Sequence, residues 1–277
     1  MTDRRKNVFF IACSYAFFWF FVLIVALLIS GGVLQWLGIN QFISVLLLFA
    51  QIIGSWTPTF ALLFLFKKLY PNGSIKEFYV NAFNPRLNWK IITFITIIQL
   101  INFICIVLFL SLKNNVTFNN LLDLSLQTIM MGFIWTLVSG ATGEESGWRG
   151  YLQHSIQKGF GVIKASIIVG LIWGFWHAPL WFMGGFSDIE LIWYIPVFMT
   201  ALVSVSIIIG ICYNYCKNLL IPIWIHFMFN FGFSVFTGDL TDTRIGFTFY
   251  TILYVITAFG YIIWHKKFWR YKYNFKK

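Results

Sequence analysis

Apolar stretches of membrane-spanning length alternate with short polar segments along this chain. A helix needs ~20 apolar residues to cross about 30 Å of hydrocarbon. Eight stretches approach that length, at roughly residues 8–30, 43–66, 91–112, 124–142, 163–183, 192–214, 219–237 and 246–265. The pattern predicts an all-α, polytopic transmembrane helical bundle of about eight spans. We expect a single integral-membrane domain over residues 1–277.

Composition and charge agree with a membrane protein. Hydrophobic residues make up 59% of the chain and charged residues 10%, whereas a soluble domain would need more polar surface. We expect both termini to be cytoplasmic, because eighteen of the 20 Lys and Arg residues, Arg149 among them, then fall in cytoplasmic segments, and Lys113 and Arg244 are the other two. This is the positive-inside pattern. The net charge of +11 is then explained by contact with anionic membrane lipids, and we expect no nucleic-acid partner.

The first apolar stretch, at residues 8–30, is longer than the core of a signal peptide, and no A-x-A cleavage site follows it. We therefore expect this stretch to be retained as a membrane anchor.

Three polar clusters interrupt the apolar stretches in the second half of the chain. They are Glu144-Glu145 with Arg149, then His177, then His226 with Asn230. Ionisable side chains inside a membrane are costly and usually have a partner or a function. Helical rise from the nearest cytoplasmic lysine gives depths of about 21 Å for Glu144, about 20 Å for His177 and Asn230, and about 14 Å for His226. The clusters are therefore expected to meet in one intramembrane site.

The two adjacent glutamates are expected to have different roles. On a helix, Glu145 and Arg149 are four residues apart and can form an ion pair. Glu144 is rotated by about 100° and is not reached by that arginine. We expect Glu145 to be held by the salt bridge and Glu144 to remain free for proton transfer. The alternative interpretation is a helix end that reaches cytoplasmic water, where the pattern would have little meaning.

Small residues recur at four-residue spacing beside two of the clusters. The stripes are Gly143-Gly147 and Gly170-Gly174-Ala178. Small residues at a helix interface let two helices approach closely. We expect the two stripes to pack against each other and to bring His177 towards Glu144.

The polar set suits hydrolysis of an amide or ester by an activated water. A free carboxylate near a histidine can take a proton from water, and a second histidine with an asparagine can donate hydrogen bonds to the oxyanion. The sequence contains no Gly-x-Ser-x-Gly or His-Glu-x-x-His motif, which disfavours serine-hydrolase and standard zinc-protease sites. A zinc site formed by His177, His226 and one glutamate, such as Glu144, stays an alternative. Asn230 suits an oxyanion donor better than a zinc ligand, which favours metal-free catalysis.

The three motifs resemble those of the CPBP family (CAAX prenyl proteases and bacteriocin-processing enzymes, also called the Abi family). The family pattern is Glu-Glu-x-x-x-Arg, Phe-x-x-x-His and His-x-x-x-Asn on separate transmembrane helices. The resemblance covers roughly residues 130–235, within expected catalytic core helices at 124–237. One position departs from the pattern, because Trp173 stands where Phe is usual. An aromatic ring is kept there, so we expect a change in pocket shape only.

This resemblance implies an intramembrane endopeptidase that cleaves a membrane-associated, prenylated or leader-type peptide. It implies that Glu144 activates water together with His177. It also implies that His226 and Asn230 hold the oxyanion, and that Arg149 orients Glu145 or the neighbouring loop. Family members are often described as metalloproteases, so a zinc ion stays open.

The branches of the family differ in substrate. The eukaryotic branch trims three residues from prenylated CAAX proteins, and bacterial relatives are linked to peptide maturation and immunity to bacteriocins. The compact chain, rich in Ile, Phe, Lys and Asn, favours a member from a bacterial plasma membrane. Two further hypotheses stay open, a non-catalytic immunity or scaffold membrane protein and a proton-coupled transporter.

Overall fold

The computed structural model describes residues 2–32, 36, 43–183, 187–237 and 244–274. Lys276 and Lys277 of the expected basic tail lie outside these residues. The described helices are α1 (Asp3–Ser30), α3 (Ile43–Ser55), α4 (Thr57–Phe64), α5 (Phe66–Leu69), α6 (Ile75–Phe83), α7 (Trp89–Asn114), α8 (Phe118–Leu121), α9 (Leu126–Thr136), α10 (Thr142–Glu145), α11 (His154–Trp176), α12 (Ala178–Met183), α13 (Asp188–Cys216), α14 (Leu220–Ser234) and α15 (Arg244–Asn274). Two π-helical segments flank α10, η2 (Leu137–Ala141) and η3 (Ser146–Gln153).

The expected all-α transmembrane bundle is confirmed, but the helices divide differently from the eight expected spans. Within the described residues, five helices are long and apolar enough to cross a membrane, at Asp3–Ser30, Trp89–Asn114, Leu126–Met183, Asp188–Cys216 and Arg244–Lys267. The pair α3 and α4 bends by 47° and makes a sixth if counted as one span. The fourth and fifth expected spans belong to one helical run, and α14 has only 15 residues.

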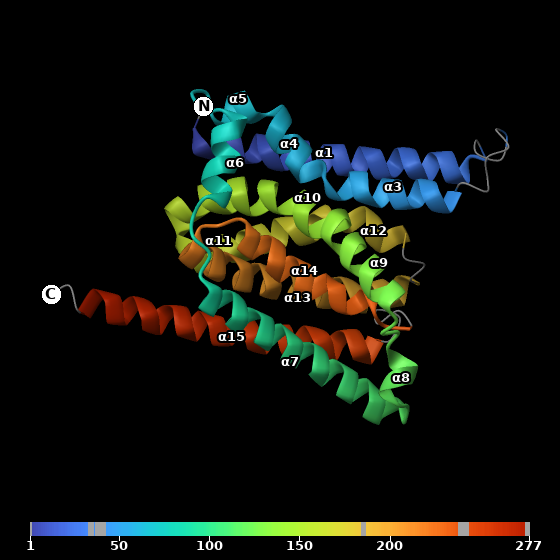
Figure 1. Ribbon diagram of the computed structural model, residues 1–277. Coiled ribbons are helices and arrows are strands. Elements are labelled where there is room, and N and C mark those ends of the chain that lie inside the picture. Colours follow the sequence, from blue (N-terminus) through green and yellow to red (C-terminus); the bar gives the residue numbers. More distant parts are fainter. Residues whose placement is uncertain (1, 33–35, 37–42, 184–186, 238–243, 275–277) are drawn as a thin grey trace.

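The helical run from Leu126 to Met183 changes direction at Gly161. This residue has a φ of +72°, a conformation that glycine adopts without the steric cost that other residues meet. The part of α11 that follows packs back along η3. Figure 1 shows α1 and α3 along one side of the bundle, α7 and α15 along the opposite side, and α11, α13 and α14 between them.

The first glycine stripe lies against the break between α3 and α4. A Cβ atom added at Gly143 would lie 2.7 Å from Cδ1 of Trp56, and one added at Gly147 would lie 2.7 Å from the carbonyl oxygen of Pro58. Contacts this short are not tolerated, so the two glycines are needed for the approach of this segment to the glutamates.

The second glycine stripe faces α13 instead. A Cβ atom added at Gly170 would lie 2.8 Å from Cα of Val203, and one added at Gly174 would meet the sulfur of Met199. The expectation that the two stripes pack against each other is therefore wrong. The first stripe packs against the break between α3 and α4, and the second packs against α13. Four-residue spacing alone does not predict which neighbour a stripe contacts.

Polar side chains from α7 and α15 fix the short helix α14. Nε2 of Gln99 donates to the carbonyl oxygen of Ile225 at 3.3 Å, and the hydroxyl of Tyr254 donates to Oε1 of Gln99 at 2.8 Å. The hydroxyl of Tyr250 donates to the carbonyl oxygen of Phe229 at 2.8 Å. Each bonded carbonyl belongs to the residue just before one of the polar side chains predicted for the site, so these bonds set the depth and rotation of α14.

We expect Gly147→Ala to lower the free energy of unfolding by about 1–3 kcal/mol, because the new methyl group would meet the backbone of Pro58. The measurement is reversible unfolding in detergent micelles. Gly159→Ala is the matched control, since Gly159 lies in α11 and a Cβ there has nothing within 4 Å. Equal stability of the two variants would show that α4 can move away freely.

Candidate active site

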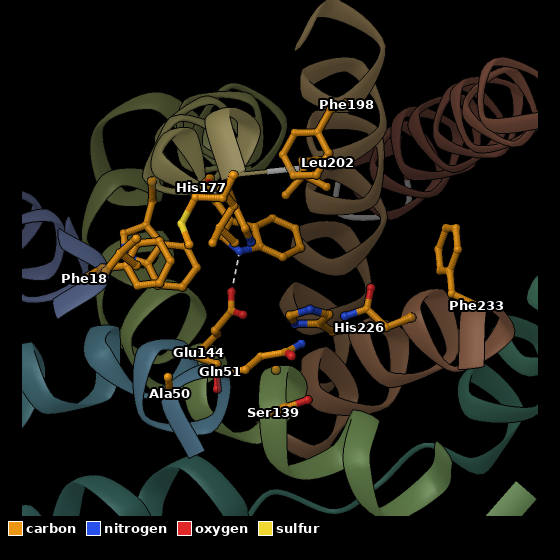
Figure 2. Close-up of a pocket in the computed structure, with 18 of the residues that line it drawn as sticks. Phe18, Ala50, Gln51, Ser139, Glu144, His177, Phe198, Leu202, His226 and Phe233 are labelled. Atoms are coloured by element: carbon orange, nitrogen blue, oxygen red, sulfur yellow. Dashed lines mark hydrogen bonds between the residues drawn. The ribbon is translucent and has the colours of Figure 1, made fainter. Parts of the chain in front are cut away.

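The predicted polar residues line one cavity. It has a volume of about 730 Å³ and lies between α1, α3, α11, α13, α14 and the segment around Glu144. Most of its wall is apolar, and its polar lining includes Gln51, Ser139, Glu144, His177, His226 and Asn230. Figure 2 shows Glu144 and His226 directed into the same space from opposite sides. Glu145 and Arg149 are not part of the lining and lie behind it.

The two glutamates are carried by α10, a single turn between the π-helical segments η2 and η3. π-helical turns, which are wider than α-helical turns, are frequently found at functional sites. Glu144 is 4% exposed, and Glu145 and Arg149 are both 0% exposed. The alternative interpretation of a helix end in cytoplasmic water is therefore wrong. Arg149 lies inside the helical segment η3 and not in an exposed loop.

Glu145 contacts two side chains through one oxygen. Its Oε1 lies 2.9 Å from Nη1 of Arg149, the expected ion pair, and 2.7 Å from Nδ1 of His226. Within the described residues, Oε2 of Glu145 and Nε and Nη2 of Arg149 have no hydrogen-bond partner. The guanidinium carbon of Arg149 lies 4.4 Å from the ring centroid of Trp173, a distance typical of a cation–π contact.

Glu144 has a different partner and a free oxygen. The indole N–H of Trp173 donates to its Oε2. Its Oε1 lies 4.0 Å from the point that a Cβ atom on Gly140 would occupy, and Nε2 of His226 and Nδ2 of Asn230 lie 3.8 Å and 3.5 Å from the same point. Three polar atoms from two segments thus surround the space that the missing side chain of Gly140 leaves.

His177 has a defined tautomer in this arrangement. Its Nδ1 lies 2.8 Å from the carbonyl oxygen of Trp173. A carbonyl only accepts, so Nδ1 carries the hydrogen and Nε2 is the acceptor of the neutral ring. The ring packs against Trp176 and Phe198, with centroid distances of 4.7 Å and 5.4 Å. His177 therefore offers a basic nitrogen in the cavity.

The alternative zinc site would draw on His177, His226 and Glu144, all of which line the cavity. Among the described residues, no three His, Cys, Asp or Glu side chains are grouped so that they could hold a metal ion. Nδ1 of His226 is engaged by Glu145 and Oε2 of Glu144 by Trp173, so Nε2 of His226 and Oε1 of Glu144 are the atoms that these two side chains leave open in the cavity. A zinc ion at His177, His226 and Glu144 stays the alternative to metal-free hydrolysis.

Sequence reasoning missed the role of two residues. Trp173 was expected to change the shape of the pocket only, yet its N–H contacts Glu144. Gln51 was not singled out, and Figure 2 shows its side chain reaching towards Glu144 and His226. The available signal for Gln51 was a lone amide in the otherwise apolar helix Ile43–Ser55.

Two comparisons with known proteins match this part of the chain. Residues 125–232, which contain all six predicted site residues, match the model of a family described as type II CAAX prenyl endopeptidase Rce1-like. A curated protein of Methanococcus maripaludis named CAAX prenyl protease 2 is 29% identical over 208 residues, which cover 71% of this chain and 74% of that protein.

We expect Arg149→Ala to destabilise the protein by about 3–5 kcal/mol, because it breaks a fully buried ion pair and leaves Glu145 with His226 alone. Thermal unfolding in micelles measures the loss.

Arg244→Ala is the matched control for this change. Its ion pair with Glu190 has a similar length of 3.0 Å, but the two side chains are 52% and 37% exposed. Such a surface pair contributes only about 0–1 kcal/mol. If both variants had the same unfolding temperature, the ion pair of Arg149 and Glu145 would be unimportant for stability.

Proposed function

We propose, on the premise that the chain belongs to the CPBP family of membrane proteases, that it hydrolyses a peptide bond with a water activated by Glu144. The observation that carries this proposal is the convergence of three polar atoms beside Gly140. Oε1 of Glu144, Nε2 of His226 and Nδ2 of Asn230 all lie within 4.0 Å of one point. A carboxylate facing two hydrogen-bonding nitrogens is the arrangement that addition of water to a carbonyl requires.

The first step is the attack of water. Oε1 of Glu144 takes one proton from a water in the space beside Gly140, and the water oxygen bonds to the carbonyl carbon of the substrate. Nε2 of His177, the acceptor in the neutral ring, helps to orient this water. The carbonyl oxygen becomes an oxyanion. When the intermediate collapses, the C–N bond breaks and the proton held by Glu144 passes to the leaving nitrogen.

The oxyanion is held by the asparagine amide and by the second histidine. Nδ1 of His226 lies against a carboxylate oxygen, which only accepts, so Nδ1 carries a hydrogen. Nε2 then donates to the oxyanion when His226 is an imidazolium, whose charge Glu145 offsets. Glu145 and Arg149 act through this ring, and the amide of Asn230 supplies the second donor.

The walls of the cavity fit an apolar substrate group. Phe18, Phe21, Val25 and Leu47 from α1 and α3 line it together with the polar residues. The relative's name, CAAX prenyl protease 2, points to prenylated peptides that end in a CAAX sequence. A substrate of this class would place its isoprenoid or its apolar side chains along these walls and its peptide bond beside Gly140.

We expect Glu144→Gln to lower the turnover of a farnesylated CAAX peptide by about 10²- to 10⁴-fold, because the amide cannot take a proton from water. The measurement is the release of the C-terminal fragment from purified protein in micelles, followed by mass spectrometry. Glu77→Gln is the matched control, since Glu77 lies in the exposed capping box of α6. Wild-type turnover by Glu144→Gln would remove the catalytic assignment.

We expect chelators to leave this turnover unchanged, because the proposed step uses the Glu144 carboxylate as the base and Asn230 with His226 as the oxyanion donors. Activity after treatment with 1,10-phenanthroline is compared with activity in buffer, and the metal content of the purified protein is measured in parallel. Loss of activity that zinc restores, with one zinc bound per chain, would refute the metal-free proposal.

A further inference from the structure

Trp173 contacts four ionisable side chains around the centre of the site. It lies on α11, one turn before His177, and is 2% exposed. Its N–H donates to Glu144, and its ring lies under the guanidinium of Arg149. Its ring edge meets the imidazole of His226, with centroids 4.9 Å apart and planes at 73°, and its carbonyl accepts from His177 at 2.8 Å. This is also the position at which the chain departs from the CPBP motif.

The indole N–H selects which oxygen of Glu144 is free. It occupies Oε2, so Oε1 is the oxygen left to face the space beside Gly140, where His226 and Asn230 converge. A carboxylate on a flexible side chain would otherwise rotate among several orientations. A phenylalanine at position 173 would carry a ring but no hydrogen-bond donor. Neither oxygen of Glu144 would then be held by residue 173.

The face of the same ring accommodates Arg149. Only Nη1 of this arginine has a hydrogen-bond partner within the described residues, Oε1 of Glu145. The π face of Trp173, 4.4 Å from the guanidinium carbon, offsets part of the remaining buried charge. Because the ring presents its face to Arg149 and its N–H edge to Glu144, one side chain contacts both groups and keeps the guanidinium directed at Glu145.

We propose that Trp173 is a positioning residue that assigns the two glutamates to different tasks. Its N–H holds Glu144 with Oε1 towards the water, and its ring face keeps Arg149 on Glu145, which in turn orients His226. The inference rests on the proposed hydrolysis by Glu144. It adds a residue that does not touch the scissile bond and that determines the geometry of the base.

We expect Trp173→Phe to lower kcat for the farnesylated peptide about ten- to a hundredfold, the loss that follows from one hydrogen bond to a charged group. KM is expected to stay at the wild-type value, because the lost donor acts on the base and not on the bound peptide. Replacement of Trp173 by 3-benzothienylalanine, which keeps the bicyclic ring and lacks the N–H, is expected to give the same kcat defect. This second variant decides the question if the smaller phenylalanine ring disturbs folding.

Trp148→Phe is the matched control. Trp148 is also fully buried, its N–H has no partner within the described residues, and it does not line the cavity. This variant loses comparable packing, so it reports the effect of a smaller ring on stability alone. We expect wild-type kcat from it. Equal kcat for Trp148→Phe and Trp173→Phe in an active protein would overturn the positioning role.

A double-mutant cycle in unfolding separates this inference from the proposed function. Trp173→Phe and Glu144→Ala are combined, and the free energies of unfolding in micelles are compared for the four proteins. Non-additive effects support the contact between the two side chains, whereas additive effects overturn it even if no peptide is cleaved. If wild type cleaves no prenylated or leader-type peptide but the effects are coupled, the proposed substrate class fails and the contact stands.

Discussion

One carboxylate oxygen, Oε1 of Glu145, joins the two halves of the site. It accepts from Arg149 on the same helical run and from His226 on α14. All three side chains are buried, and a charge buried without a partner would be strongly destabilising. This pairing occupies Nδ1 of His226, so Nε2 faces the cavity. Arg149 is thereby paired with Glu145, and Glu144 lines the cavity with one oxygen that has no such partner.

The surrounding fold makes this pairing possible by holding two short segments firmly. The helix α14 is held by hydrogen bonds from Gln99 and Tyr250 to its backbone carbonyls. The turn that carries the glutamates approaches α3 and α4 closely because Gly143 and Gly147 have no side chains. Catalytic groups need to be held within a few tenths of an ångström, and rigid neighbours on both sides supply that constraint.

The cavity combines a small polar centre with a mostly apolar wall. Hydrogen bonds and ion pairs are stronger where water is largely excluded, so the few polar atoms near Gly140 act with more effect than they would at a surface. The same apolar wall suits a substrate that resides in the membrane. The composition that anchors the protein in the bilayer therefore also shapes the environment of the reaction.

The sequence by itself determined the membrane location, the helical class and the pairing of Glu145 with Arg149. These follow from local properties, since apolar length decides insertion and four-residue spacing places two side chains on one helix face. Similar depths also brought Glu144, His177 and Asn230 into one expected region. An estimate of depth gives the position of a residue along the helix axis, but it does not determine how the helix is rotated about that axis.

The tertiary structure alone decided which helix faces meet. Gly170 faces α13 and not the stripe of Gly143, and the reversal at Gly161 lies inside a run that hydropathy divides into two spans. The contact of His226 with Glu145 and that of the Trp173 N–H with Glu144 depend on how separate helices are rotated against each other. That rotation is set by the packing of many side chains at once, and no short motif contains it.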